Sequence, residues 1–265
     1  FMLKEIYDQK HSISDTMRGR LNLDDGTSNL GGITEFLPNI LSASRIYITA
    51  CGTSWHAGLI GKHLIEEYAK VPVHVEYASE FRYRNAIIDA NTILIAISQS
   101  GETADTLAAI RKSKELGAIT LGICNVVGSS IARETDCGVY IHAGPEIGVA
   151  STKAFTSQVS VLSMVAILLA QRLGKDTEYI HRLVKEMPRL PEMVQNILDD
   201  SDHIRDIAEH ERIPSVQELN YFIAYKGGQS LWRFIAGKYG REKIGDVFRS
   251  MKRTQNAEKG YENAL

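Results

Sequence analysis

The feature that most constrains the fold is the alternation of short apolar segments with longer helical ones along the first 173 residues. Each of these short segments has the length and composition of a strand, and most are followed by a stretch with helical spacing. The predicted strands cover residues 45–50, 71–77, 93–97, 119–124 and 138–142, and the predicted helices cover residues 51–70, 104–116, 128–134 and 153–173. Strands that alternate with helices pair in parallel, so the sequence predicts an α/β fold with a parallel sheet sandwiched by helices.

The other segments are predicted to be helical or irregular. Residues 1–20 are polar and predict a peripheral helix, whereas the glycine-containing residues 22–32 predict a loop. Two further helices with one apolar face are predicted at the end of a first domain, which covers residues 1–212. Residues 213–265 differ in composition, with 9 Lys/Arg, 5 Asp/Glu and 8 of the 20 aromatic residues, and form a separate, mainly helical segment in our interpretation.

The composition is that of an ordinary globular protein, with 44% hydrophobic and 23% charged residues. A formal net charge of −2 predicts no general attraction to nucleic acid or to an anionic membrane. The longest apolar stretch, Val159 to Ala170, has 12 residues and two serines, so we expect a buried helix and no membrane span. An odd cysteine count and the lack of a recognisable secretion signal predict a cytoplasmic location.

No metal or cofactor site is recognisable. Cys51, Cys124 and Cys137 lack metal-type spacing, and the first two fall at predicted strand ends, where a buried small hydrophobic residue is the expected role. His56 and His63 lie two turns apart on one predicted helix, without a third ligand at a suitable spacing. A dinucleotide is disfavoured because no G-x-G-x-x-G follows a predicted strand.

Two strand-to-helix turns carry hydroxyl side chains. Ser98-Gln99-Ser100-Gly101-Glu102-Thr103 follows the third predicted strand, and Cys51-Gly52-Thr53-Ser54 follows the first. Hydroxyls and free N–H groups at a helix N-terminus favour an anion, and ligands of open parallel sheets bind beyond the carboxyl ends of the strands. Without a long glycine-rich loop, the anion is expected to be small, such as a sugar phosphate.

Simpler structural roles are the alternatives. Ser and Thr often cap helices, but one cap needs one hydroxyl, and three cluster between Ser98 and Thr103. Glu146 either meets solvent, orders its loop or contacts a sugar hydroxyl. Lys153 either neutralises the phosphate or, as is more common for lysine in a first helical turn, is merely exposed. Glu102 is expected to act as an acid favoured by a helix dipole.

Five motifs, in order along the chain, resemble one family. They are Cys51-Gly-Thr-Ser54, Ala78-Ser-Glu-Phe-Arg-Tyr-Arg84, Ser98-Gln-Ser-Gly-Glu-Thr-Ala-Asp-Thr106, Cys124-Asn-Val-Val-Gly-Ser-Ser130 and Glu146-Ile-Gly-Val-Ala-Ser-Thr-Lys-Ala-Phe-Thr156. The family is glutamine–fructose-6-phosphate aminotransferase (isomerizing), also called glucosamine-6-phosphate synthase. The resemblance covers residues 1–212, is to the first sugar-isomerase (SIS) subdomain, and implies a flavodoxin-like, three-layer SIS fold.

The resemblance also implies a ligand and the residues that bind it. The ligand is fructose 6-phosphate or glucosamine 6-phosphate, in the biosynthesis of amino sugars by a homodimeric transferase without a cofactor. The residues implied are Ser54, Ser98, Gln99, Ser100 and Thr103 for the phosphate, Thr53 beside the substrate, and Val149 and Ser151 along the sugar.

Several parts of the family enzyme are not recognisable in this sequence. We identify no glutaminase domain, no glutamate base, no lysine-bearing tail, and no histidine after His210. The catalytic residues are therefore left unassigned, and the chain alone is expected to be inactive. The alternative function is a non-catalytic sugar-phosphate-binding or regulatory SIS module.

Overall fold

A computed structural model describes residues 1–175 and 177–200, and Phe1–Leu198 form one compact unit. The predicted domain boundary after residue 212 and the predicted helical tail lie outside the described residues, so both stay predictions.

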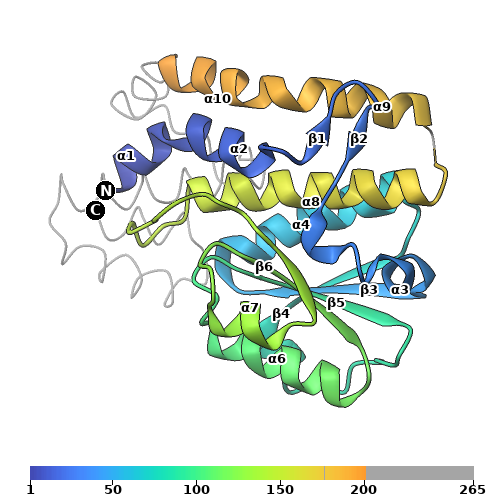
Figure 1. Cartoon of the computed structure of the whole chain (residues 1–265). Coiled ribbons are helices and arrows are strands. Elements are labelled where there is room, and N and C mark those ends of the chain that lie inside the picture. Colours follow the sequence, from blue (N-terminus) through green and yellow to red (C-terminus); the bar gives the residue numbers. More distant parts are fainter. Residues whose placement is uncertain (176, 201–265) are drawn as a thin grey trace, which may run out of the picture. The chain divides into compact units, whose positions relative to one another are not determined.

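Five parallel strands form the sheet at the centre of this unit (Figure 1). They are β3 (Arg45–Ala50), β4 (Val73–Tyr77), β5 (Thr92–Ser98), β6 (Ile119–Cys124) and β7 (Cys137–Tyr140). Their spatial order is β4-β3-β5-β6-β7, and every neighbouring pair is parallel. The order is that of flavodoxin-like sheets, so the predicted fold class is confirmed.

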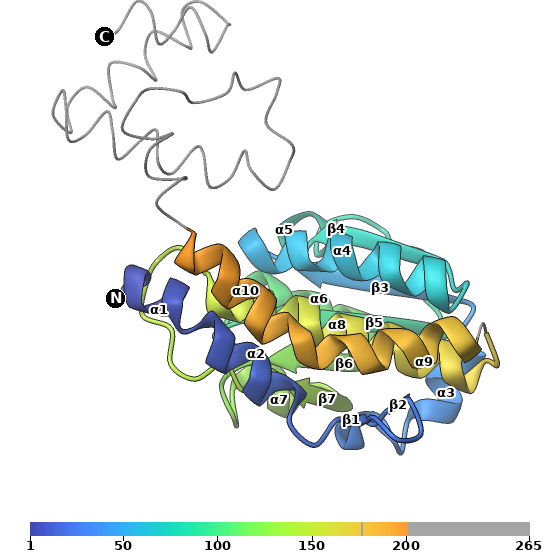
Figure 2. The ribbon, with the colours of Figure 1, turned by 90° about the horizontal axis from the view of Figure 1, so that it is seen from above.

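Helices cover both faces of the sheet. On one face lie α4 (Gly52–Tyr68) and α8 (Lys153–Arg172), and on the other lie α5 (Ala78–Phe81), α6 (Ala104–Glu115) and α7 (Ser130–Glu134) (Figure 1). A further layer packs over α8 in both ribbon views (Figures 1 and 2). It consists of α1 (Met2–Tyr7), α2 (Gln9–Met17), α9 (Thr177–Glu186), the short helix η2 (Met187–Arg189) and α10 (Leu190–Asp199).

The strands are specified by side chains that alternate between two apolar layers. In β5, Ile93, Ile95 and Ile97 belong to the hydrophobic cluster that includes α8, whereas Leu94 and Ala96 belong to the cluster that includes α6. Because a strand has a period of two, a central strand covered on both faces is apolar throughout, and all seven residues of β5 are buried.

The long helix α8 is the core helix of the unit. It packs closely on α4 at Gly61, where a Cβ atom would lie 2.9 Å from both Cδ atoms of Leu162. Within the described residues, α8 is the one helix long and apolar enough to cross a membrane by length and composition, but most of it is buried inside the unit. This burial confirms the predicted core helix.

The N-terminal segment differs from its prediction in two ways. Residues 1–20 form two helices, and α2 is not peripheral, because it buries Ile13, Thr16 and Met17 beside α8. The predicted loop contains a small hairpin of β1 (Leu21–Asn22) and β2 (Thr27–Ser28), followed by the short helix η1 (Gly31–Ile33). Strands of two residues are too short to produce a recognisable period. A further short helix, α3 (Leu37–Ser42), precedes β3 and was also not predicted.

Candidate functional site

The two hydroxyl-bearing turns lie side by side at the carboxyl edge of the sheet. They follow β3 and β5, which are neighbours and place Ala50 opposite Ile97. The helices that follow, α4 and α6, pack on opposite faces of the sheet (Figure 1). This arrangement is a topological switch point, where helices diverge from neighbouring strands and leave a crevice for a ligand.

The turn after β5 is held by its own hydroxyls. Ser98 Oγ accepts a hydrogen bond from the N–H of Gly101 at 3.0 Å and lies 3.1 Å from Thr103 Oγ1. Ser100 Oγ accepts a hydrogen bond from the N–H of Glu102 at 3.2 Å. Gly101 has a φ of +69°, and a Cβ atom there would collide with Ser129 Oγ. Only glycine therefore fits this position.

The capping alternative is not supported by these contacts. Thr103 is the N-cap residue of α6, yet its side chain makes no capping hydrogen bond, and Cys51 likewise makes none at the start of α4. The bonds that Ser98 and Ser100 accept come from N–H groups before α6 begins. Hence these side chains do not satisfy the first N–H groups of the two helices, which are the groups that attract an anion.

A residue of α8 supports the turn after β3. Gln158 Nε2 donates a hydrogen bond to Ser54 Oγ at 3.0 Å, and both side chains are buried. Gln158 is not among the ligand residues predicted from the sequence. Its one signal in the sequence is an amide within an otherwise apolar part of the helix.

The pattern of accepted hydrogen bonds leaves hydroxyl protons available at this edge of the sheet. Ser54 and Ser100 each accept a bond from a donor of the chain, so the O–H of each remains free to donate. Ser98 and Thr103 share one proton between their oxygens, which leaves the other proton free. An acceptor-only group such as a phosphate dianion matches such a set of donors.

The loop between β7 and α8, residues 141–152, carries the other two predicted ligand residues, Val149 and Ser151. Val149 is fully exposed. The carboxylate of Glu146 accepts hydrogen bonds from Ser151 Oγ at 3.0 Å and from the N–H groups of Thr152 at 2.8 Å and Ala154 at 3.2 Å. Of the three roles considered for Glu146, the geometry shows that it orders the loop and satisfies N–H groups at the start of α8. Because the hydroxyl of Ser151 donates to Glu146, the lone pairs of Ser151 Oγ remain available to accept a hydrogen bond from a ligand.

The expectation that Lys153 is exposed is wrong. Its side chain is almost completely buried, and its Nζ lies 2.7 Å from Asp8 Oδ2. Packing of the N-terminal helices on α8 encloses this lysine, a long-range contact that the local sequence does not reveal. The carboxylate of Asp8 therefore balances its charge.

Glu102 has a structural partner as well. Its carboxylate accepts a hydrogen bond from the N–H of Ser130 at 2.8 Å, at the start of α7. Hydrogen bonds from Ser130 lower the pKa of Glu102, so the carboxylate stays ionised and is a weak base. Glu102 thus acts as an acid at a helix N-terminus, but at that of α7 and not at that of α6, the helix that it precedes in the sequence.

The cysteines are free thiols. Burial raises the pKa of Cys124 to about 11 and that of Cys137 to about 12, so both are protonated near neutral pH. Cys124 is buried, as expected, whereas Cys51 is partly exposed beside the turn after β3. In the described part of the chain, no group of three His, Cys, Asp or Glu side chains is placed to hold a metal ion.

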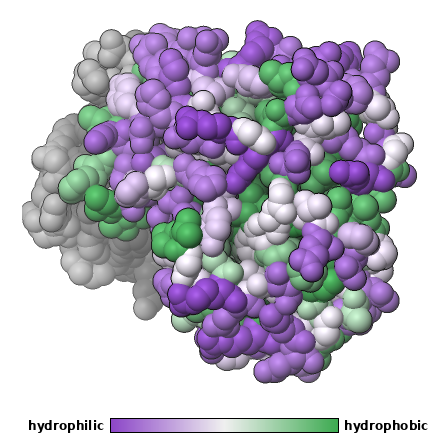
Figure 3. Space-filling view, viewed as in Figure 1, coloured by the Kyte–Doolittle hydropathy of each residue, from purple (hydrophilic) through white to green (hydrophobic). Residues whose placement is uncertain are grey.

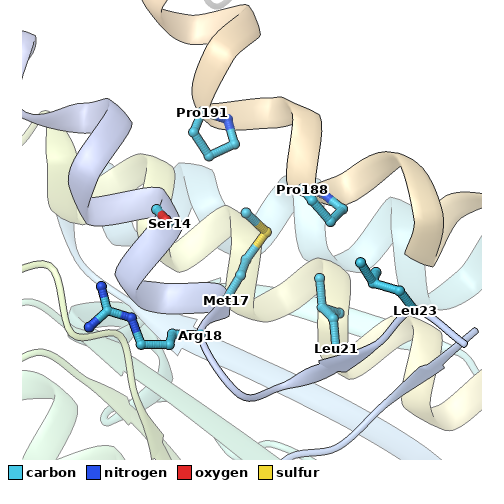
Figure 4. A pocket seen from close by; sticks show the side chains of 7 residues that line it. All are labelled: Ser14, Met17, Arg18, Leu21, Leu23, Pro188 and Pro191. Atoms are coloured by element: carbon cyan, nitrogen blue, oxygen red, sulfur yellow. The ribbon is translucent and has the colours of Figure 1, made fainter.

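A pocket on the unit lies outside the candidate site. It opens between α2, the β1 segment and the turn into α10, and Figure 4 shows the apolar side chains that form most of its wall. Its lining residues are Ser14, Met17, Arg18, Leu21, Leu23, Pro188 and Pro191. The one charged group, Arg18, is paired with Asp15. The pocket includes none of the predicted ligand residues and does not suit a phosphate.

On the face seen in Figure 3, hydrophilic side chains predominate and hydrophobic ones occur in small separate groups. This face of the unit therefore offers no extended apolar patch of the kind that marks a large permanent interface.

Comparison with known proteins decides the family. The SIS domain family matches residues 39–168. Glutamine–fructose-6-phosphate aminotransferase (isomerizing) of Chlorobaculum tepidum is 57% identical over 208 residues, which are 78% of this chain and 34% of the relative. The chain carries a SIS domain of the glutamine–fructose-6-phosphate aminotransferase family. A solved structure, the C-terminal domain of glucosamine-fructose-6-phosphate aminotransferase from Francisella tularensis, matches this SIS domain with a TM-score of 0.72 and 40% identity, over 78% of this chain and 58% of that one.

A longer alignment extends beyond the first 212 residues. The aminotransferase of Bacteroides thetaiotaomicron is 49% identical over 238 residues, which are 87% of this chain and 39% of the relative. The similarity to the family thus enters residues 213–265, the segment in which none of its motifs is recognisable. The chain spans about a third of the length of the curated relatives it matches.

Proposed function

We propose that this SIS domain binds a hexose 6-phosphate, fructose 6-phosphate or glucosamine 6-phosphate, as part of an aminotransferase that forms amino sugars. The observation that carries the proposal is the pair of turns at the switch point, which place donor hydroxyls and helix N-termini at the same edge of the sheet. The names of the relatives supply fructose 6-phosphate, and the resemblance to the family adds glucosamine 6-phosphate.

Each predicted ligand residue has a role in this proposal. The phosphate binds to Ser54, Ser98, Gln99, Ser100 and Thr103, and Thr53 lies beside the substrate. Val149 and Ser151 contact the sugar from the loop before α8. We further propose that the protein acts as a cytoplasmic homodimer, without a metal or organic cofactor and without nucleic-acid or membrane partners, and that this chain alone is inactive.

Hexose 6-phosphates are expected to stabilise the purified chain, because a ligand that binds only the native state raises stability by mass action. A thermal-shift titration measures this effect for fructose 6-phosphate and glucosamine 6-phosphate, with fructose and glucosamine as matched controls. The phosphate esters should raise the melting temperature, and the free sugars should not. Equal responses to fructose and fructose 6-phosphate would contradict a phosphate site.

Replacing Ser100 or Thr103 by Ala is expected to weaken binding of fructose 6-phosphate by about 1.5–3 kcal/mol, the contribution of one hydrogen bond to a charged group. Titration calorimetry measures the affinity, and circular dichroism checks the fold. Ser42→Ala is a matched control, because Ser42 is exposed at the end of α3, which precedes the amino end of β3. Unchanged affinity in both site variants would show that these hydroxyls are not ligands.

A further inference from the structure

The middle of the loop between β7 and α8 is held by the N-terminal helix. Glu5, on α1, accepts hydrogen bonds from the N–H groups of Ile147, at 2.6 Å, and Gly148, at 3.1 Å. Its second carboxylate oxygen also lies 3.1 Å from the N–H of Gly148. Only 5% of Glu5 is exposed, which is unusual for a carboxylate, and these donors account for its burial. Both ribbon views show the loop beside α1 (Figures 1 and 2).

The contact is close as well as polar. A Cβ atom at Gly148 would lie 2.5 Å from Glu5 Oε2 and 3.3 Å from Met2 Cβ. The backbone of the loop therefore rests directly against α1, and the glycine permits this approach. A second contact joins the N-terminal helices to the end of this loop, because Asp8 forms an ion pair with the buried Lys153 at the start of α8.

The loop has separate anchors along its length. Asn125, after β6, binds its beginning through the N–H of Ala143, at 3.0 Å, and the carbonyl of Gly144, at 2.7 Å. Glu146 binds its end, as described above. Glu5 binds the stretch between these two anchors, immediately before Val149.

We infer that Glu5 is a positioning residue for the sugar side of the candidate site, because it fixes the backbone that presents Val149 and Ser151. The part of this inference that concerns sugar binding rests on the proposed function, whereas the anchoring of the loop by Glu5 does not. The phosphate residues lie on the turns after β3 and β5, which are other segments of the chain than the one that Glu5 binds. Loss of Glu5 should therefore weaken the contacts to the sugar and leave the contacts to the phosphate unchanged.

The geometric part is tested without a ligand. Glu5→Gln keeps the size of the side chain but removes its charge, which weakens the bonds from both N–H groups, and replaces one acceptor oxygen by an NH₂ group, which would face the N–H of Gly148 donor to donor. Amide hydrogen exchange at Ile147 and Gly148 should become about 10-fold faster or more, whereas exchange in β5 should not change. Glu115→Gln is the matched control, because Glu115 is exposed at the end of α6. Unchanged exchange at both amides would overturn the inference.

The functional part is tested by comparing two ligands. In Glu5→Gln, the dissociation constant of fructose 6-phosphate should rise about 10-fold, the effect of one hydrogen bond with a charged partner, while that of inorganic phosphate stays constant. A general loss of structure would weaken both ligands together. Gly148→Ala disturbs the same contact from the loop side, since the added methyl group would push the loop away from Glu5. This variant should also lose affinity for fructose 6-phosphate and not for inorganic phosphate.

The outcomes separate the two proposals. Equal weakening of both ligands, or no weakening of either, in Glu5→Gln and Gly148→Ala would overturn the positioning role. A parent chain that binds neither ligand would contradict the proposed function, and faster exchange in Glu5→Gln would then still support the anchoring of the loop by α1. Selective loss for fructose 6-phosphate in both variants would support the inference.

Discussion

Replacing Leu162 by Ala is expected to lower the free energy of unfolding by about 2–5 kcal/mol, the usual loss for a buried leucine. Leu162 lies in the middle of α8, its side chain is fully buried, and its methyl groups face Gly61 on α4. Because Gly61 has no side chain that could move into the space, the cavity should persist after the substitution. Chemical denaturation, followed by circular dichroism, measures the change.

The matched control is Leu116→Ala, because Leu116 is 46% exposed just after α6. Surface substitutions usually change the free energy of unfolding by less than about 0.5 kcal/mol, and we expect such a value for this variant. A similarly small loss for Leu162→Ala would mean that the contact between α4 and α8 does not stabilise the unit.

The sheet was predictable because its signal is local and repeated. Most of the strands are apolar segments bounded by polar or turn residues, whereas β4 alternates apolar and polar residues. In the central strand β5, the continuous apolar run indicates that both faces are covered. The two hydroxyl turns were predictable for the same reason, since each follows a strand and precedes a helix. Their proximity follows from the order of the strands, which places β3 beside β5.

The contacts that support the site were not predictable, because each joins residues far apart in the sequence. Gln158 binds Ser54, Lys153 binds Asp8, and Glu5 binds the loop at Gly148. Nothing in the residues around Glu5 indicates a buried carboxylate, because its donors are backbone N–H groups more than 140 positions away. Composition and periodicity report which face of an element is buried, but they do not report its polar partner.

The isolated chain is expected to form no glucosamine 6-phosphate from fructose 6-phosphate, either with glutamine or with excess ammonium. Isomerisation needs a base within hydrogen-bond reach of the substrate, and such a group typically contributes about 10²–10⁴-fold to the rate. The carboxylates beside the candidate site already have structural partners: Glu146 binds N–H groups at the start of α8, and Glu102 binds Ser130. The lowered pKa of Glu102 makes it a poor proton acceptor.

The measurement is the amount of glucosamine 6-phosphate formed by purified protein over time, with the thermal shift by fructose 6-phosphate as the control for a folded, ligand-competent sample. Binding without turnover is the expected combination, because a bound ligand is positioned but no proton moves between its C1 and C2 atoms. Turnover at the rate of a complete aminotransferase would contradict this expectation. Such turnover would imply an unrecognised base, and substitution of the five acidic residues among positions 213–265, one at a time, would test whether it lies there.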